Sequence, residues 1–216
     1  MNLTNKKVLF LGDSITEGVG VSCRDKRYTD VFENISCADV YNYGISGTRI
    51  SRQKTPSAEP KFDYCFLDRV ETMEADADVV VVFGGTNDFG HGDSPLGKFE
   101  DRDEYSFYGA LHSLINRIVN RYPKATVVFM TPLHRTTEDF LINEIGLKRN
   151  SLKTYVDAMI EVCGYYSVPV LDLFRVSGLQ PDIEIIKKTY MPDGLHPSDK
   201  GAEIIANRLF GFLSSL

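Results

Sequence analysis

The sequence predicts an α/β protein with three layers, in which helices cover both faces of a five-stranded parallel sheet. Short apolar runs alternate along the chain with segments of helical periodicity, which is the pattern of repeated strand–helix–strand units. The run at residues 78–83, Asp-Val-Val-Val-Val-Phe, is almost continuously β-branched, as in a central parallel strand buried on both faces. The 216 residues, 43% of them hydrophobic, are enough for one sizeable core. We therefore expect a single domain over residues 1–216.

The apolar runs and the helical periodicities define the expected elements in order. Five runs are expected to form strands: Lys7–Leu11, Val40–Tyr43, Asp78–Phe83, Ala125–Met130 and Val168–Leu173. Five amphipathic segments are expected to form helices: Thr29–Ile35, Asp63–Met73, Tyr105–Tyr122, Leu147–Val162 and Ser198–Leu213. The inner face predicted for the third helix holds Leu111, Leu114, Ile115, Ile118 and Val119. The long stretches expected to be irregular are 51–61, 90–104, 132–146 and 178–192.

The composition excludes several classes of protein. The formal net charge is −6, and the basic pairs Lys6-Lys7 and Lys187-Lys188 are isolated, so no nucleic-acid partner is expected. No apolar segment near the N-terminus is long enough for a signal peptide or a membrane span, and we expect a cytoplasmic protein. In that compartment the four scattered cysteines (23, 37, 65 and 163) are expected to be reduced.

A serine follows the first predicted strand directly. That strand ends in Gly12-Asp13-Ser14, and ligands of open α/β sheets bind at the carboxyl ends of strands. The chain later contains Asp193-Gly194-Leu195-His196, in which the aspartate lies three residues before a histidine. This gives the order Ser, Asp, His, one of the orders known for a Ser-His-Asp triad. Taken singly, Ser14 also fits a helix N-cap, and Asp193 fits a capping acid beside a loop histidine.

Two further segments follow predicted strands and contain hydrogen-bond donors. Asn87, in Gly84-Gly85-Thr86-Asn87-Asp88, has a side-chain amide that can donate to a developing oxyanion. Gly44 follows the second strand, and its backbone N–H can approach a substrate oxygen closely because no side chain intervenes. Ordinary turn chemistry also explains either segment alone.

Together, the four segments resemble the conserved blocks of the SGNH hydrolases, also called the GDSL esterase/lipase family. The resemblance extends from Val8 to His196. It implies a flavodoxin-like α/β/α fold and a triad of Ser14, His196 and Asp193, with no metal and no cofactor. It also implies an oxyanion hole made of the Ser14 N–H, the Gly44 N–H and the Asn87 side chain.

The remaining polar candidates are less firmly placed. Asp13, Arg49 and His134 are candidates for substrate contacts, with a surface position for Arg49 as the alternative. We do not expect His134 to act as the base, because we find no carboxylate at a matching spacing. His112 is expected to be structural and His91 to be exposed to solvent. No group of histidines and cysteines has metal-ligand spacing.

The expected function is a serine esterase that removes a short acyl group, acetyl first, from a polar alcohol such as a carbohydrate. The partner would be a small-molecule ester. The sequence contains no evident long apolar lid, and the stretches 90–104 and 132–146 look polar. The main alternative is a lysophospholipase or acyl thioesterase with the same mechanism. A catalytically idle binding protein and a nucleotide binder are weaker alternatives, the latter because no Gly-x-Gly-x-x-Gly or P-loop is present.

Overall fold

The computed structural model describes residues 1–143 and 145–216, and a five-stranded parallel sheet forms its centre. The strands are β1 (Lys7–Gly12), β2 (Asp39–Gly44), β3 (Val79–Phe83), β4 (Thr126–Met130) and β5 (Val170–Leu171). Their order across the sheet is β2-β1-β3-β4-β5. The carboxyl ends of β1, β2 and β3 lie side by side, since Gly12 pairs with both Gly44 and Phe83. The predicted fold class is confirmed.

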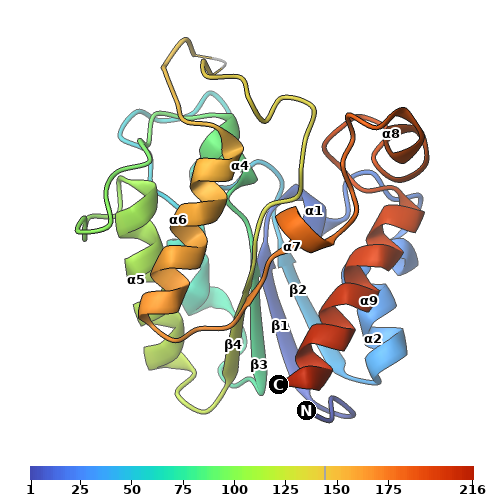
Figure 1. Ribbon diagram of the computed structural model, residues 1–216. Helices are drawn as coiled ribbons and strands as arrows, with labels where there is room; N and C mark the ends of the chain where they lie inside the picture. Colours follow the sequence, from blue (N-terminus) through green and yellow to red (C-terminus); the bar gives the residue numbers. More distant parts are fainter. Residues whose placement is uncertain (144) are drawn as a thin grey trace.

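Helices cover both faces of the sheet (Figure 1). The α-helices are α1 (Ser14–Glu17), α2 (Tyr28–Ser36), α3 (Phe66–Arg69), α4 (Thr86–Gly90), α5 (Phe107–Arg121), α6 (Leu152–Tyr165), α7 (Leu173–Val176), α8 (Glu184–Tyr190) and α9 (Asp199–Ser215). Short 3₁₀ turns occupy Arg24–Lys26, Pro60–Asp63 and Val70–Thr72. One core packs α3, α5 and α6 against the sheet, and a second core packs α2 and α9 against the other face. The result is the predicted three-layer sandwich.

The ends of the chain meet below the sheet. Figure 1 places both termini at the amino ends of the strands, and the Met1 amino group donates to the Leu213 carbonyl at 3.1 Å. The loops that follow the strands all lie at the opposite edge. Within residues 1–143 and 145–216, no helix combines the length and the hydrophobicity that crossing a membrane requires.

Several predicted elements have different bounds in the structure. The helix expected at Asp63–Met73 is broken into α3 and a 3₁₀ turn. The helix expected from Leu147 begins only at Leu152, because residues 141–149 are held by loop hydrogen bonds such as Arg149 N to the Leu141 carbonyl. Strand β5 has two residues instead of six, and the Asp172 side chain caps α7 directly after it.

Two other expectations about these elements are wrong. The stretch 178–192 contains α8, which we expected to be irregular. Val119 is 44% exposed, whereas the four other residues predicted for the inner face of α5 are buried. Val119 lies at the margin of the apolar stripe, where a helix turns from the core towards the solvent.

Candidate active site

Ser14 lies at the tip of β1, where the chain turns into α1. Gly12 permits this turn, because a Cβ there would lie 1.9 Å from the Thr16 hydroxyl oxygen. The Asp13 carboxylate caps α1 by accepting the Ile15 N–H at 3.0 Å. Ser14 is buried, and no residue that the structure describes accepts a hydrogen bond from its N–H. The turn therefore presents a hydroxyl and an unused backbone donor at the same edge of the sheet.

The loop between α8 and α9 brings a histidine to this hydroxyl from 182 residues away. His196 Nε2 lies 3.0 Å from Ser14 Oγ, and His196 Nδ1 lies 2.6 Å from Asp193 Oδ2. The other oxygen of Asp193 accepts the N–H groups of Leu195 and His196 at 2.9 and 2.7 Å. The structure thus aligns carboxylate, imidazole and hydroxyl in the order that nucleophilic activation of a serine needs.

The charge state of Asp193 follows from these contacts. Its side chain is 54% exposed. Partial burial works against ionisation, but the hydrogen bonds from His196 and the backbone outweigh it and lower the pKa of the Asp193 carboxyl. Asp193 is therefore an anion near neutral pH, and it can hold a proton on His196 Nδ1 and stabilise a charged imidazolium ring.

Asn87 lies on α4, which starts directly after β3. Its side-chain nitrogen donates to the Thr48 carbonyl at 2.9 Å, and its side chain is buried. The amide group has a second N–H, which leaves one donor for a further acceptor. This contact also places the loop that follows β2 against α4.

The structure contradicts the choice of Gly44 as a backbone donor. The Gly44 N–H already donates to Asn42 Oδ1 at 2.8 Å. The residue is needed for packing, because a Cβ on Gly44 would lie 2.1 Å from the Glu17 nitrogen. Gly47, three residues later, has a left-handed φ of 76°, and none of the described residues accepts its N–H. The spacing of glycines after a strand does not reveal which N–H is already bonded.

Two buried charged residues that the sequence analysis did not single out hold these loops in place. Asp88 accepts the N–H groups of Ile50 and Ser51 at 3.0 and 2.9 Å, and so fixes the loop after Gly47 to α4. Arg69 donates to the carbonyls of Gly12 and Tyr43 at 3.0 and 2.6 Å, and so ties together the ends of β1 and β2. Their long-range partners are visible only in three dimensions.

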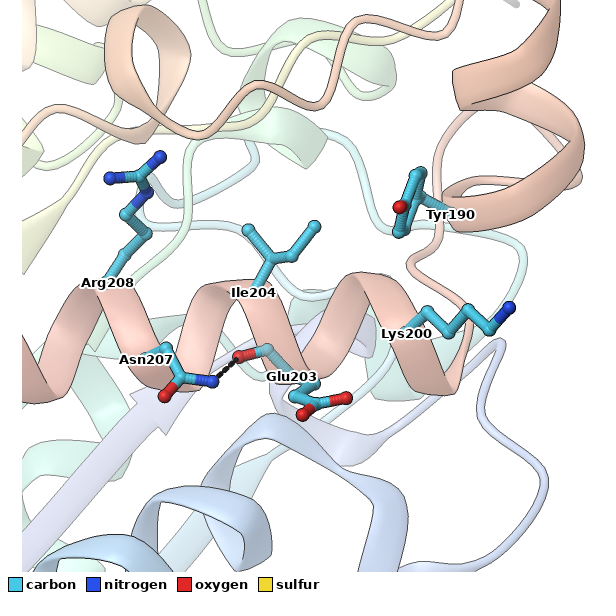
Figure 2. A pocket seen from close by; sticks show the side chains of 6 residues that line it. All are labelled: Tyr190, Lys200, Glu203, Ile204, Asn207 and Arg208. Carbon is cyan, nitrogen blue, oxygen red and sulfur yellow. Dashed lines mark hydrogen bonds between the residues drawn. The ribbon is translucent and has the colours of Figure 1, made fainter.

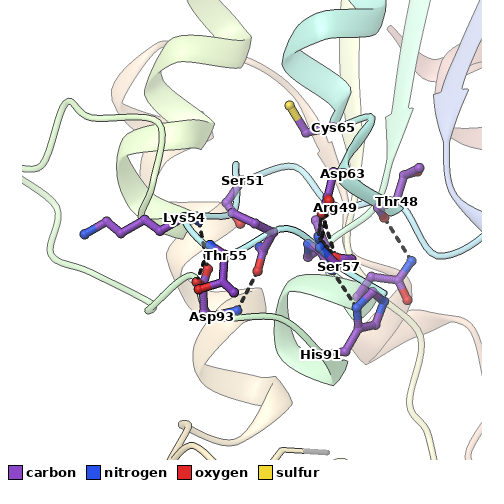
Figure 3. Close-up of polar contacts among 12 residues, drawn as sticks. Thr48, Arg49, Ser51, Lys54, Thr55, Ser57, Asp63, Cys65, His91 and Asp93 are labelled. Atoms are coloured by element: carbon purple, nitrogen blue, oxygen red, sulfur yellow. Dashed lines mark hydrogen bonds and ion pairs between the residues drawn. The ribbon is translucent and has the colours of Figure 1, made fainter. Parts of the chain in front are cut away.

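Arg49 is not a surface residue. Its side chain is 1% exposed. Figure 3 shows it among Asp63, Ser57 and His91, with Nη2 2.9 Å from Asp63 Oδ1 and Nη1 2.6 Å from His91 Nδ1. The expectation that His91 is exposed is also wrong, since this contact half-buries the ring. The guanidinium is taken up by these protein partners, and the ion pair fixes the loop beside Gly47.

His134 has the carboxylate partner that the sequence analysis did not find. Its Nδ1 lies 2.9 Å from Glu138 Oε2, one helical turn further along the chain, and its ring lies on Phe174 at 3.7 Å between centroids. None of its contacts in the described chain is with Ser14 or Asn87. His112, in contrast, is structural as predicted: it is buried in α5 and contacts the Tyr166 hydroxyl at 3.0 Å.

Asp13 combines burial with a capping role. Burial raises the pKa of its carboxyl to about 7. The carboxylate contacts the Ile15 N–H beneath Ser14, so it supports the turn from within. In this structure its role is to shape the turn.

The loop between β4 and α6 is more apolar at its tip than we expected. Large hydrophobic side chains are exposed there, namely Phe140, Leu141, Ile142, Ile145 and Leu147. In Figure 1 this loop rises above the carboxyl edge of the sheet. The expectation that the stretch 132–146 is polar therefore fails at its tip.

Hollows elsewhere on the surface lack comparable chemistry. One of about 620 Å³ runs along α9, and Figure 2 shows that its lining includes Tyr190, Lys200 and Arg208, with no residue of the Ser14 site. In the part of the chain that the structure describes, no group of three or more His, Cys, Asp or Glu side chains is placed to hold a metal ion.

Comparisons with known proteins agree with the geometry. The model of the GDSL-like lipase/acylhydrolase family matches residues 10–204. A solved structure from Lactobacillus plantarum is 31% identical over 98% of both chains, with a TM-score of 0.82. A possible lipase from Chitinophaga pinensis is 23% identical over 97% of this chain and 98% of the other, with a TM-score of 0.71. The acetyl xylan esterase AlAXEase is 20% identical over 95% of this chain and 98% of the other, with a TM-score of 0.65.

A search of curated proteins found no match. The family match covers most of the chain and includes the turn at Ser14, the α4 segment and the loop at His196. The family in general implies ester hydrolysis. This chain belongs to the GDSL-like lipase/acylhydrolase family.

Proposed function

We propose that this protein is a serine esterase that removes a short acyl group, acetyl first, from an oxygen ester of a polar alcohol such as a carbohydrate. The observation that carries the proposal is the row of Asp193, His196 and Ser14, with 2.6 and 3.0 Å between successive polar atoms. A neutral imidazole at this distance can take the hydroxyl proton, which turns a weak nucleophile into an effective one.

The reaction proceeds in two halves. Ser14 Oγ attacks the acyl carbon while His196 Nε2 takes its proton. The bond from the acyl carbon to the alcohol oxygen then breaks, and His196 returns the proton to that oxygen. Water, deprotonated by His196, attacks the acyl-enzyme and releases the carboxylic acid and Ser14. Asp193 holds the Nδ1 proton throughout and stabilises the imidazolium.

The negative oxygen of each tetrahedral intermediate needs fixed donors. We assign the Ser14 N–H, the second N–H of the Asn87 amide and the Gly47 N–H to this role, with Gly47 in place of Gly44. Support comes from the unused N–H groups of Ser14 and Gly47 and from the 2.9 Å contact between Asn87 and the Thr48 carbonyl, which lies next to Gly47 in the chain. The proposal needs no metal and no cofactor.

The preference for a short acyl group and a polar alcohol is supported by the charged side chains around the site, such as Arg135 and His134, which are half-buried. The fold likeness to an acetyl xylan esterase is in keeping with it. A second candidate, a lysophospholipase or acyl thioesterase with the same mechanism, is favoured by the exposed apolar tip of the loop between β4 and α6. A longer acyl chain would find apolar surface there.

The test is hydrolysis of p-nitrophenyl esters with acyl chains of two to twelve carbons. We expect the highest kcat/KM at acetate, and Ser14→Ala lowers kcat by roughly 10⁴- to 10⁶-fold, as removal of the nucleophile does in other triads. Ser215→Ala, at the exposed end of α9, is the matched control and keeps wild-type rates. A maximum at long chains would favour the second candidate. Activity that survives Ser14→Ala would refute the assigned nucleophile, and inertness of folded protein towards every ester would favour a binding protein.

A further inference from the structure

Arg135, in the loop after β4, is a half-buried cation without a carboxylate partner. Its Nε donates to Thr137 Oγ1 at 3.0 Å, and its Nη1 lies 3.3 Å from both the carbonyl and the hydroxyl oxygen of Thr86. No carboxylate that the structure describes lies within ion-pair distance of it. Its Nη2 has no hydrogen-bond partner among the described residues and is not one of the buried unpartnered atoms, so it is open to solvent.

The position of Arg135 links the two halves of the candidate site. Thr86, which it contacts, directly precedes Asn87 on α4. The next residue, Thr136, donates its N–H to the Gly194 carbonyl at 3.0 Å, inside the loop that carries Asp193 and His196. Arg135 therefore lies between the oxyanion donor on α4 and the base.

The electrostatic surroundings leave this cation uncompensated. Burial lowers the pKa of the Arg135 guanidinium, Arg149 lowers it further, and Asp13 and Asp193 act on it only at longer range. The nearby carboxylates are engaged elsewhere: Asp193 contacts His196, and Asp13 accepts the Ile15 N–H. Such a cation is unexpected in a chain with a net charge of −6 unless something negative meets it.

We propose that Arg135 recognises an anionic group, a carboxylate or a phosphate, on the alcohol half of the ester substrate. The inference rests on the proposed function and narrows its substrate class. The alcohol half is indicated because the leaving oxygen must reach His196 Nε2, and the loop of Arg135 is bonded to the loop of His196. A planar guanidinium with a free N–H edge suits carboxylate and phosphate oxygens, and partial burial strengthens the contact.

Matched aryl acetates test the inference. We would measure kcat/KM for 4-acetoxybenzoate, 4-acetoxyphenyl phosphate and the neutral methyl 4-acetoxybenzoate, and take the ratio of each anionic ester to the neutral one. In the wild type we expect this ratio, corrected for the spontaneous hydrolysis rates, to favour an anionic ester. Arg135→Gln lowers the ratio by about 10- to 100-fold, as the loss of a hydrogen bond to a charged group predicts, mainly through KM. Arg135→Lys keeps part of the preference, and the preference weakens at high salt.

The control is Arg208→Gln, which removes an exposed arginine on α9 and leaves the ratio at its wild-type value. The anionic ester with the larger loss on Arg135→Gln identifies the carboxylate or the phosphate as the preferred group. An equal loss on all three esters would overturn the inference and assign Arg135 to the support of Thr86. If the wild type hydrolyses none of them, including the neutral ester, the proposed function fails and the recognition of the alcohol fails with it.

Discussion

Two histidines in this molecule have opposite partners. His196 has a carboxylate at Nδ1 and the Ser14 hydroxyl at Nε2, at 2.6 and 3.0 Å. His91 has the Arg49 guanidinium 2.6 Å from its Nδ1, and its ring makes a further hydrogen bond to the backbone of Gly47. Because an arginine is always charged, the Nδ1 of His91 must accept and cannot take up a proton. The carboxylate beside His196 has the reverse effect and favours the protonated ring.

The comparison shows that the partner of a histidine assigns its role. Burial, with Arg49 and Arg135, lowers the pKa of His91 to about 4, so this ring stays neutral and supports the loop of Gly47. His134 is the intermediate case. It has a carboxylate, Glu138, at Nδ1, but its ring lies on Phe174 and no serine hydroxyl among the described residues meets it. A His–carboxylate pair is therefore insufficient for catalysis without a nucleophile.

The strongest way to break this comparison is to replace the two carboxylate-paired histidines in turn. We expect His196→Gln to lower kcat on p-nitrophenyl acetate by roughly 10⁴- to 10⁶-fold, since it removes the base. His134→Gln should lower kcat by less than about tenfold, because only a contact with Glu138 is lost, and a hydrogen bond of this kind contributes about 1 kcal/mol. Steady-state kinetics at pH 7.5, with circular dichroism to verify folding, measure both effects.

The reverse order of effects would overturn the assignment of the base. A large loss in both variants would mean that His134 also acts on the substrate, and its contact with Glu138 would then be a second functional pair.

A smaller effect is expected at the oxyanion donors. Asn87→Ala should lower kcat by about 10²- to 10³-fold with little change in KM, because a donor that acts only in the transition state is removed. Asn120→Ala, on the exposed side of α5, is the matched control, since its side chain only bonds the Asn116 carbonyl within the same helix. Unchanged turnover in a folded Asn87→Ala protein would exclude Asn87 from the oxyanion hole.

Much of the fold could be predicted because its signals are local. The valines of β3 are buried on both faces of the sheet and need no distant partner to be recognised as a central strand. The polar residues at strand ends were found in the same way, since the carboxyl ends of parallel strands meet at one edge. Ser14 and His196 lie within hydrogen-bond distance although 182 residues separate them.

What could not be predicted depends on contacts distant in sequence. Arg49 looks like a surface residue until Asp63 and His91, 14 and 42 residues away, are brought to it by the fold. Gly44 and Gly47 both follow β2, and only the Asn42 side chain, which takes the Gly44 N–H, distinguishes them. Hydrophobic periodicity contains no information about either kind of contact, because it reports burial and not hydrogen bonding.

The smallest expected effect concerns stability and sharpens the comparison from the side of His91. Its pKa is about 4 in the folded protein and returns towards its ordinary value of 6.5 on unfolding. Between these values the unfolded chain binds more protons, so the free energy of unfolding falls as the pH drops from 6.5 to 4, by at most about 3 kcal/mol. Asp13 acts with the opposite sign: burial raises its pKa to about 7, so its contribution to stability falls as the pH rises from 4 to 7.

His91→Gln isolates the first effect, because glutamine can replace the hydrogen bonds but does not titrate, while Asp13 is unchanged in both proteins. Denaturant unfolding of the wild type and the variant at pH 4.5, 5.5, 6.5 and 7.5 gives the two curves. We expect the free energy of unfolding of the wild type to fall more steeply than that of the variant below pH 6.5, and the difference between them to be constant above it. Parallel curves over the whole range would mean that the His91 ring takes up a proton as readily in the folded protein as in the unfolded chain. The guanidinium of Arg49 would then not be what separates His91 from His196.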